Sequence, residues 1–71
     1  MKVFNVDGHV VVASDSNEAV CKDVANRLVV MVGLVNSRAQ TERFYNDLLL
    51  NARNGSVTVR GVVYHAEEIL N

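Results

Sequence analysis

The sequence contains no proline, no tryptophan and only one cysteine, Cys21. A single cysteine cannot form a disulfide within the chain, which excludes the cross-links that stabilise many small domains. The only histidines are His9 and His65, so no set of cysteine and histidine residues has the spacing of a structural zinc site. We therefore expect no metal and no cofactor, and association with a second chain is the remaining way for so short a chain to gain stability.

Glycine-rich segments, long apolar runs and excess charge are also absent. The four glycines are isolated at positions 8, 33, 55 and 61, which excludes a glycine-rich phosphate-binding loop. No apolar run approaches the roughly 20 residues of a membrane span, and a net charge of −1 predicts no strong attraction to an anionic membrane or to nucleic acid. The first apolar stretch is short and is interrupted by Asn5 and Asp7, unlike a signal peptide, so we expect a cytoplasmic protein.

What the sequence does contain is apolar side chains. Its 71 residues predict one small domain, residues 1–71, and 49% of them are hydrophobic. A chain of this size buries roughly 60% of the surface that it exposes when unfolded. The apolar fraction is therefore generous for the core that can form, and it favours a homodimer in which part of the remaining surface is covered.

Residues 2–13 predict a β-hairpin whose two-residue loop is formed by Asp7 and Gly8. Asp-Gly between two runs rich in β-branched residues favours a type I′ turn, because this turn requires positive φ at both central positions. One face of the hairpin carries Phe4, Val6, His9, Val11 and Ala13, and the other carries Val3, Asn5, Val10 and Val12. Since neither face is clearly polar, we expect the sheet to be covered on both sides.

A first helix is predicted to begin at Asp15 or Ser16. Asp15 and Glu18 have the spacing of a capping box, in which the first side chain accepts a hydrogen bond from the backbone of the helix's first turn. Apolar residues then recur at helical intervals as far as residue 35. The first half of this segment has a polar side and an apolar side, as an ordinary surface helix does.

Residues 28–35 contain no polar side chain, so they fit either the end of the first helix or a buried strand. We favour the helix, because its phase continues without a turn signal. Gly33 then fits either a close helix contact or a frayed end. In this phase Val29, Val30 and Leu34 lie on the side of the helix that is polar further upstream. We expect these three residues to form part of an interface between chains.

A second helix is predicted before the dipeptide formed by Asn54 and Gly55. Ser37 and Gln40 fit a capping box at its start, and the Asn-Gly pair fits a left-handed C-cap at its end. Leu50 lies among charged residues on the outer side of this helix. A single exposed leucine is normal in a soluble protein, and the alternative is that Leu50 belongs to the contact surface.

The end of the chain predicts a third strand, because apolar and other residues alternate over positions 57–64. Arg60 and Gly61 allow an alternative, in which a tight turn divides this segment into a second hairpin. Residues 65–71 are either the end of the strand or one helical turn. With a single last strand the order is β-β-α-α-β, and the fold is an α+β domain with a three-stranded antiparallel sheet packed against two helices.

The sequence does not indicate an enzyme. Cys21 falls on the apolar side of the first helix, where a thiol behaves as a small hydrophobic group. Ser14 and Ser16 are explained by helix capping. One cluster near the end of the chain could exchange protons. It consists of Tyr64, His65, Glu67 and Glu68. No second group of catalytic residues accompanies this cluster in the sequence.

The middle of the chain is basic, with six basic and three acidic side chains in residues 22–60. Arginine binds phosphate well, and it is also enriched in protein interfaces. Four arginines are therefore candidates for contact with a partner or with nucleic acid: Arg38, Arg43, Arg53 and Arg60. The helical phase does not place Arg38 and Arg43 on one stripe, and no nucleic-acid-binding motif is apparent.

Two functions follow from these observations. The first is a small non-catalytic protein-binding module of residues 1–71 that acts by protein–protein contact as a homodimer. An inhibitor or adaptor of a larger machine, for example of phage or mobile-element type, has such a composition. The alternative is a nucleic-acid-binding regulatory domain that uses the arginines of positions 27–60.

Overall fold

A computed structural model describes residues 1–31 and 38–69; for residues 29–31 it describes the backbone only. The elements follow one another as β1 (Lys2–Val6), β2 (His9–Ala13), α1 (Ser16–Met31), α2 (Arg38–Asn51), β3 (Ser56–Val59) and β4 (Val62–Glu68). The predicted α+β class is confirmed. No helix among the described residues is long and apolar enough to cross a membrane.

The prediction of a single last strand is wrong, because Arg60 and Gly61 form a two-residue turn that divides it into β3 and β4. Both residues have positive φ, 51° and 79°, and Val59 pairs with Val62 across the turn. The alternative of a second hairpin is therefore right, and the sheet has four strands in place of three. The signal was weak because arginine, unlike Asp or Asn, is not a residue that favours this left-handed conformation.

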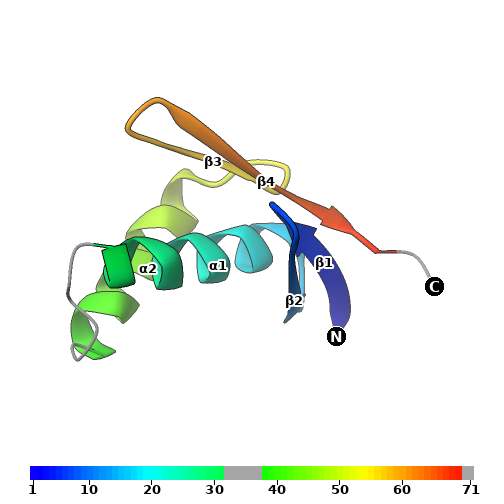
Figure 1. The fold of residues 1–71 in the computed structure, drawn as a ribbon, viewed down its shortest axis with the longest axis horizontal. Helices are drawn as coiled ribbons and strands as arrows, with labels where there is room; N and C mark the ends of the chain where they lie inside the picture. Colours follow the sequence, from blue (N-terminus) through cyan, green and yellow to red (C-terminus); the bar gives the residue numbers. More distant parts are fainter. Residues whose placement is uncertain (32–37, 70–71) are drawn as a thin grey trace.

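The strands form one antiparallel sheet in the order β2-β1-β4-β3. β4 joins the two hairpins: residues 62–65 pair with β3, and residues 66–68 pair with β1. Figure 1 shows both helices on the same side of β4. This order leaves β2 and β3 as the two edges of the sheet.

The core lies between the sheet and α1, with a smaller contribution from α2. Among the described residues, five of its twelve buried apolar side chains are alanine and four are valine, so most of them are small. They are Phe4, Val6, Ala13, Ala19, Val20, Cys21, Val24, Ala25, Leu48, Ala52, Val57 and Ala66. Such a core removes little apolar area per residue from water, which leaves a small domain with a thin margin of stability.

The start of α1 follows the predicted capping pattern. The Glu18 backbone N–H donates to Asp15 Oδ1 at 2.8 Å, and the Ala19 N–H donates to the Asp15 carbonyl at 3.0 Å. The Glu18 carboxylate in turn accepts from the N–H of Ser14 at 3.3 Å, one residue earlier than in a standard capping box. The helix continues to Met31, which confirms the helical interpretation for residues 28–31. Residues 32–37, including Gly33 and Ser37, lie outside the described residues.

Asn54 and Gly55 have the predicted left-handed conformation, but they lie beyond the helix, which ends at Asn51. They form a two-residue turn in which Arg53 and Ser56 exchange two backbone hydrogen bonds of 2.9 Å. The Gly55 N–H donates to Asn17 Oδ1, and its carbonyl accepts from Ala66, both at 2.8 Å. A Cβ on Gly55 would lie 2.8 Å from the Ser16 Cβ. Only glycine fits at this contact between the turn and α1.

Candidate functional site

The helices cover only one face of the sheet in the part of the chain that the structure describes. On the other face Val10 is 71% exposed, Val12 is 48% exposed and Val63 is 65% exposed. The expectation that the sheet is covered on both sides is therefore not met by residues 1–31 and 38–69. Val10 and Val12 lie together on β2, whereas Val63 lies on the part of β4 that pairs with β3. Exposed apolar side chains that lie together on a sheet, as Val10 and Val12 do, are typical of a contact surface.

The backbone of β2 is also open along its outer edge. Val6 and His9 flank the two-residue loop and therefore form a hydrogen-bonded pair, after which bonded and non-bonded pairs alternate along the hairpin. Val10 and Val12 are at non-bonded positions, so their N–H and C=O groups point away from β1. The position of Lys22 agrees with this, because its Nζ donates to the Val12 carbonyl at 3.3 Å from outside the sheet.

A groove of about 330 Å³ runs between β2 and α1. Residues 10–12 form its strand side, and Lys22, Asp23 and Asn26 form its helix side. We call these six residues the β2 edge site. It combines valine side chains with backbone donors and acceptors that point away from β1, which are the groups that an added strand requires. One of these acceptors, the Val12 carbonyl, also contacts the Lys22 ammonium.

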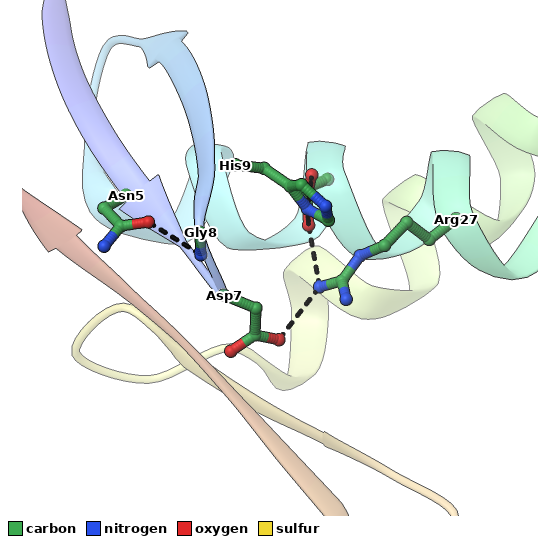
Figure 2. A network of polar contacts seen from close by, with 6 residues as sticks. Asn5, Asp7, Gly8, His9 and Arg27 are labelled. Atoms are coloured by element: carbon green, nitrogen blue, oxygen red, sulfur yellow. Dashed lines mark hydrogen bonds and ion pairs between the residues drawn. The ribbon is translucent and has the colours of Figure 1, made fainter.

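The hairpin that carries this site is held on α1 by charged side chains. Figure 2 shows Arg27 reaching from the helix toward Asp7 in the β1–β2 turn. Arg27 Nη2 lies 3.1 Å from Asp7 Oδ2 and 2.7 Å from Asp23 Oδ2. Burial acts to lower the pKa of Arg27, but the hydrogen bonds and charges of the two aspartates outweigh it and raise that pKa. The guanidinium therefore keeps its charge, and it fixes the turn to the helix.

Other side chains complete this anchor. His9 Nδ1 lies 3.2 Å from Asp23 Oδ1, so the first residue of β2 is also attached to α1. Asn5 Oδ1 accepts a 2.8 Å hydrogen bond from the N–H of Gly8 within the turn (Figure 2). The spacing of Asp23 and Arg27 on one helix face could have been recognised in the sequence. Their contact with the hairpin could not, because it depends on how the two elements pack.

Ser56 and His65 form the arrangement that most resembles catalytic chemistry. Their side chains are joined by a 2.6 Å hydrogen bond across β3 and β4. Both residues lie on the open face of the sheet, where water competes for any charge that develops and oxyanion stabilisation is weak. No carboxylate orients the His65 ring in the contacts of the described residues. This pair has the geometry of a cross-strand contact between polar neighbours.

The cluster predicted near the end of the chain is not brought together. The Arg27 guanidinium lies over the Tyr64 ring, with 5.2 Å between the guanidinium carbon and the centre of the ring. His65 contacts Ser56 instead. Glu68 pairs with Lys2 at 3.8 Å. Alternation along β4 separates these side chains onto different faces of the sheet.

Cys21 lies in the core and does not have the properties of a nucleophile. Burial, together with the charge of Asp15, raises the pKa of its thiol to about 11. At neutral pH the thiol is therefore protonated, and thiolate chemistry is suppressed. Within residues 1–31 and 38–69, no group of three His, Cys, Asp or Glu side chains could hold a metal ion.

The predicted interface residues are only partly described. Leu50 on α2 is 74% exposed, as expected for a residue outside the core. The side chains of Val29 and Val30 are not among those described, and Leu34 lies outside the described residues. A role for these residues in an interface stays a prediction.

The four candidate arginines lie on different parts of the surface. Arg38 lines a hollow between α1 and α2, and Arg43 lies further along α2. Arg53 Nη1 donates to the carbonyls of Leu50 and Ala52 at 3.1 and 2.7 Å, so it completes the end of the helix. Arg60 lies at the tip of the β3–β4 hairpin. No pocket or contact in the described part of the chain unites them.

No family model matches this chain, and comparisons with curated proteins and with solved structures gave no match either. The geometry of the β2 edge site is therefore the basis for a functional proposal.

Proposed function

We propose that this chain is a non-catalytic protein-binding module that takes up an extended polypeptide segment as an additional strand along β2. The observation that supports this proposal most directly is the free edge of β2. Val10 and Val12 direct backbone donors and acceptors outward, and the strand His9–Ala13 contains no proline and only one polar side chain. An edge without charged residues or proline is unusual in a soluble protein, because it favours pairing with another strand.

The groove beside β2 supports the same mode of binding. In strand addition the backbone supplies affinity, and pockets for alternate side chains supply specificity. Here the side chains of a bound segment that point toward the helix would lie against Lys22, Asp23 and Asn26, while those on the opposite face would lie beside Val10 and Val12. The Arg27 anchor holds the strand in place before binding, which reduces the conformational entropy lost on association.

A protein that acts in this way fits the role of an inhibitor or adaptor, since it changes a partner by contact alone. The alternative function, binding of nucleic acid through Arg38, Arg43, Arg53 and Arg60, has no comparable support. These side chains form no common surface in the described residues, and Arg53 is already bonded to the helix end. Strand addition along β2 is therefore the better supported of the two functions.

The experiment is selection of a library of short random peptides on the purified protein, followed by binding measurements on two variants. Val12→Pro removes an N–H that points away from β1, so it blocks an added strand and spares the hairpin. Thr58→Pro is the matched control, because Thr58 occupies the equivalent non-bonded position on the other edge. We expect selected peptides to be rich in β-branched residues and to bind Thr58→Pro but not Val12→Pro. Peptides that bind both variants equally would contradict the proposal.

A further inference from the structure

The geometry of β2 points to a second copy of this chain as the occupant of its edge, and we propose that two β2 strands pair antiparallel about a two-fold axis at Val11. This inference rests on the proposed function, because it names the strand that is added. The two four-stranded sheets would then join into one continuous sheet of eight strands. Each copy contributes the same surface, as a two-fold dimer requires.

The hydrogen-bonding pattern of β2 is self-complementary in this register. With Val11 opposite Val11 of the second copy, Val10 lies opposite Val12 and Val12 lies opposite Val10. These are the positions whose N–H and C=O groups point outward. Each of the two pairs can therefore form both hydrogen bonds of a bonded pair once the added strand displaces the Lys22 Nζ from the Val12 carbonyl.

The side chains of β2 fit the same arrangement. The strand reads His-Val-Val-Val-Ala, so its three central residues are identical in either direction. Pairing would bring Val10 and Val12 of both copies into two neighbouring cross-strand pairs on the open face of the sheet, where they shield one another from water. The facing groove walls carry one positive and one negative side chain, Lys22 and Asp23, so no net charge opposes the approach of two copies.

A second copy also explains what stabilises a chain of this size. The core consists largely of alanine and valine, and the sequence offers no disulfide. Chains of this length commonly gain stability by oligomerisation when they lack cross-links and metals. Pairing at β2 would give a closed dimer and not a fibre, because the remaining edge, β3, has four residues and its Ser56 backbone is already bonded to Arg53.

The first experiment is light scattering coupled to size-exclusion chromatography from micromolar to millimolar protein, with sedimentation equilibrium for the dissociation constant. We expect a dimer for the native chain and for Thr58→Pro, and a monomer for Val12→Pro. Circular dichroism shows whether each variant is folded. A native chain that remains monomeric throughout, or a folded Val12→Pro variant that dimerises as the native chain does, would overturn the inference.

The second experiment tests the register with charges and does not introduce proline. In the proposed dimer residue 10 of one copy faces residue 12 of the other. Val10→Glu combined with Val12→Glu therefore places like charges opposite each other, and Val10→Lys combined with Val12→Glu places opposite charges there. We expect the first pair to weaken the dimer by roughly tenfold or more, and the second pair to retain it. Equal weakening by both pairs would contradict this register.

The two proposals fail in different ways. If the chain is monomeric and Val12→Pro still abolishes peptide binding, the second copy is excluded and strand addition stands. If a dimer forms and is insensitive to Val12→Pro, the inference is overturned, and the interface lies elsewhere on the chain. If neither a dimer nor a selected peptide is found, both the inference and the proposed function are contradicted.

Discussion

The two edges of the sheet differ in how they are protected from other strands. β3 has four residues, and at its first residue both backbone groups are bonded to Arg53 in the turn after α2. β2 has five residues, and within residues 1–31 and 38–69 it is blocked at one point, where the Lys22 ammonium contacts the Val12 carbonyl. Natural sheets use short strands, charged side chains and covering segments to prevent edge pairing. The lack of most of these devices at β2 distinguishes it as the edge that can accept a strand.

The two hairpins differ in a second way that reinforces the first. Both have two-residue turns with positive φ, at Asp7 and Gly8 and at Arg60 and Gly61. The first turn is attached to a helix through Arg27, and the described contacts include no such link at the second turn. The open edge is therefore on the anchored hairpin. A rigid binding edge needs this anchor, because a mobile strand would lose more entropy on pairing.

The largest effect is expected at the turn that closes the β3 edge. Gly55→Ala combines a positive φ of 78° with a Cβ only 2.8 Å from the Ser16 Cβ, so we expect the free energy of unfolding to fall by about 3 kcal/mol or more. Urea denaturation measures this change. Gly61→Ala is the control, because its Cβ would meet no atom within 4 Å; its cost is the backbone strain alone, about 1–2 kcal/mol. Equal losses in the two variants would show that the contact with Ser16 is unimportant.

A smaller loss is expected when the anchor of the first hairpin is removed. Arg27→Leu leaves the Asp23 carboxylate, whose side chain is 11% exposed, without its closest partner. We expect the free energy of unfolding to fall by about 1–2 kcal/mol and amide exchange at Gly8 to become faster. Arg38→Leu, a change at an exposed arginine of α2, should alter stability by less than about 0.5 kcal/mol. If both variants lose the same amount, the charge network does not hold the hairpin.

A modest gain is expected from better turn chemistry in the second hairpin. Asn tolerates the left-handed conformation that Arg60 adopts at φ 51°, and Asn-Gly is the preferred pair in this turn. Arg60→Asn should therefore raise the free energy of unfolding by about 0.5–1 kcal/mol, which thermal denaturation detects. Arg60→Ala removes the same side chain without this preference and should give no gain. A gain of equal size in both variants would attribute the effect to the arginine charge.

The smallest effect is expected from the one side chain that blocks β2. Lys22→Ala removes the contact with the Val12 carbonyl, so we expect self-association to strengthen by roughly two- to fivefold. Sedimentation equilibrium measures the change. Lys2→Ala is matched in charge but lies on β1, where its partner is Glu68, and it should leave association unaltered. Weaker association of Lys22→Ala would mean that the lysine contributes to the interface.

Local signals were sufficient for most of the fold. The Asp7 and Gly8 turn, the Asp15 cap and the helical period of α1 are each encoded by a few neighbouring residues, and each was predicted. The turn at Arg60 and Gly61 is predicted only as the alternative to a continuous strand, because alternation along a strand does not reveal a two-residue interruption when one of the two residues is arginine. The β2 edge site was not predicted at all, although its apolar residues were noted on both faces of the hairpin.

The sequence by itself determined the α+β class and the lack of an intrachain disulfide. It also determined where the first hairpin turns and where the first helix begins, since these depend on propensities over a few residues. Tertiary structure decided which strand stands at an edge. β4 pairs with β1 through residues more than fifty positions apart, and this pairing occupies one side of β1 and leaves β2 outermost. Packing also decided that Arg27 meets Asp7. Contacts between distant segments have no local signature, and they are what placed the free edge beside a groove and anchored it.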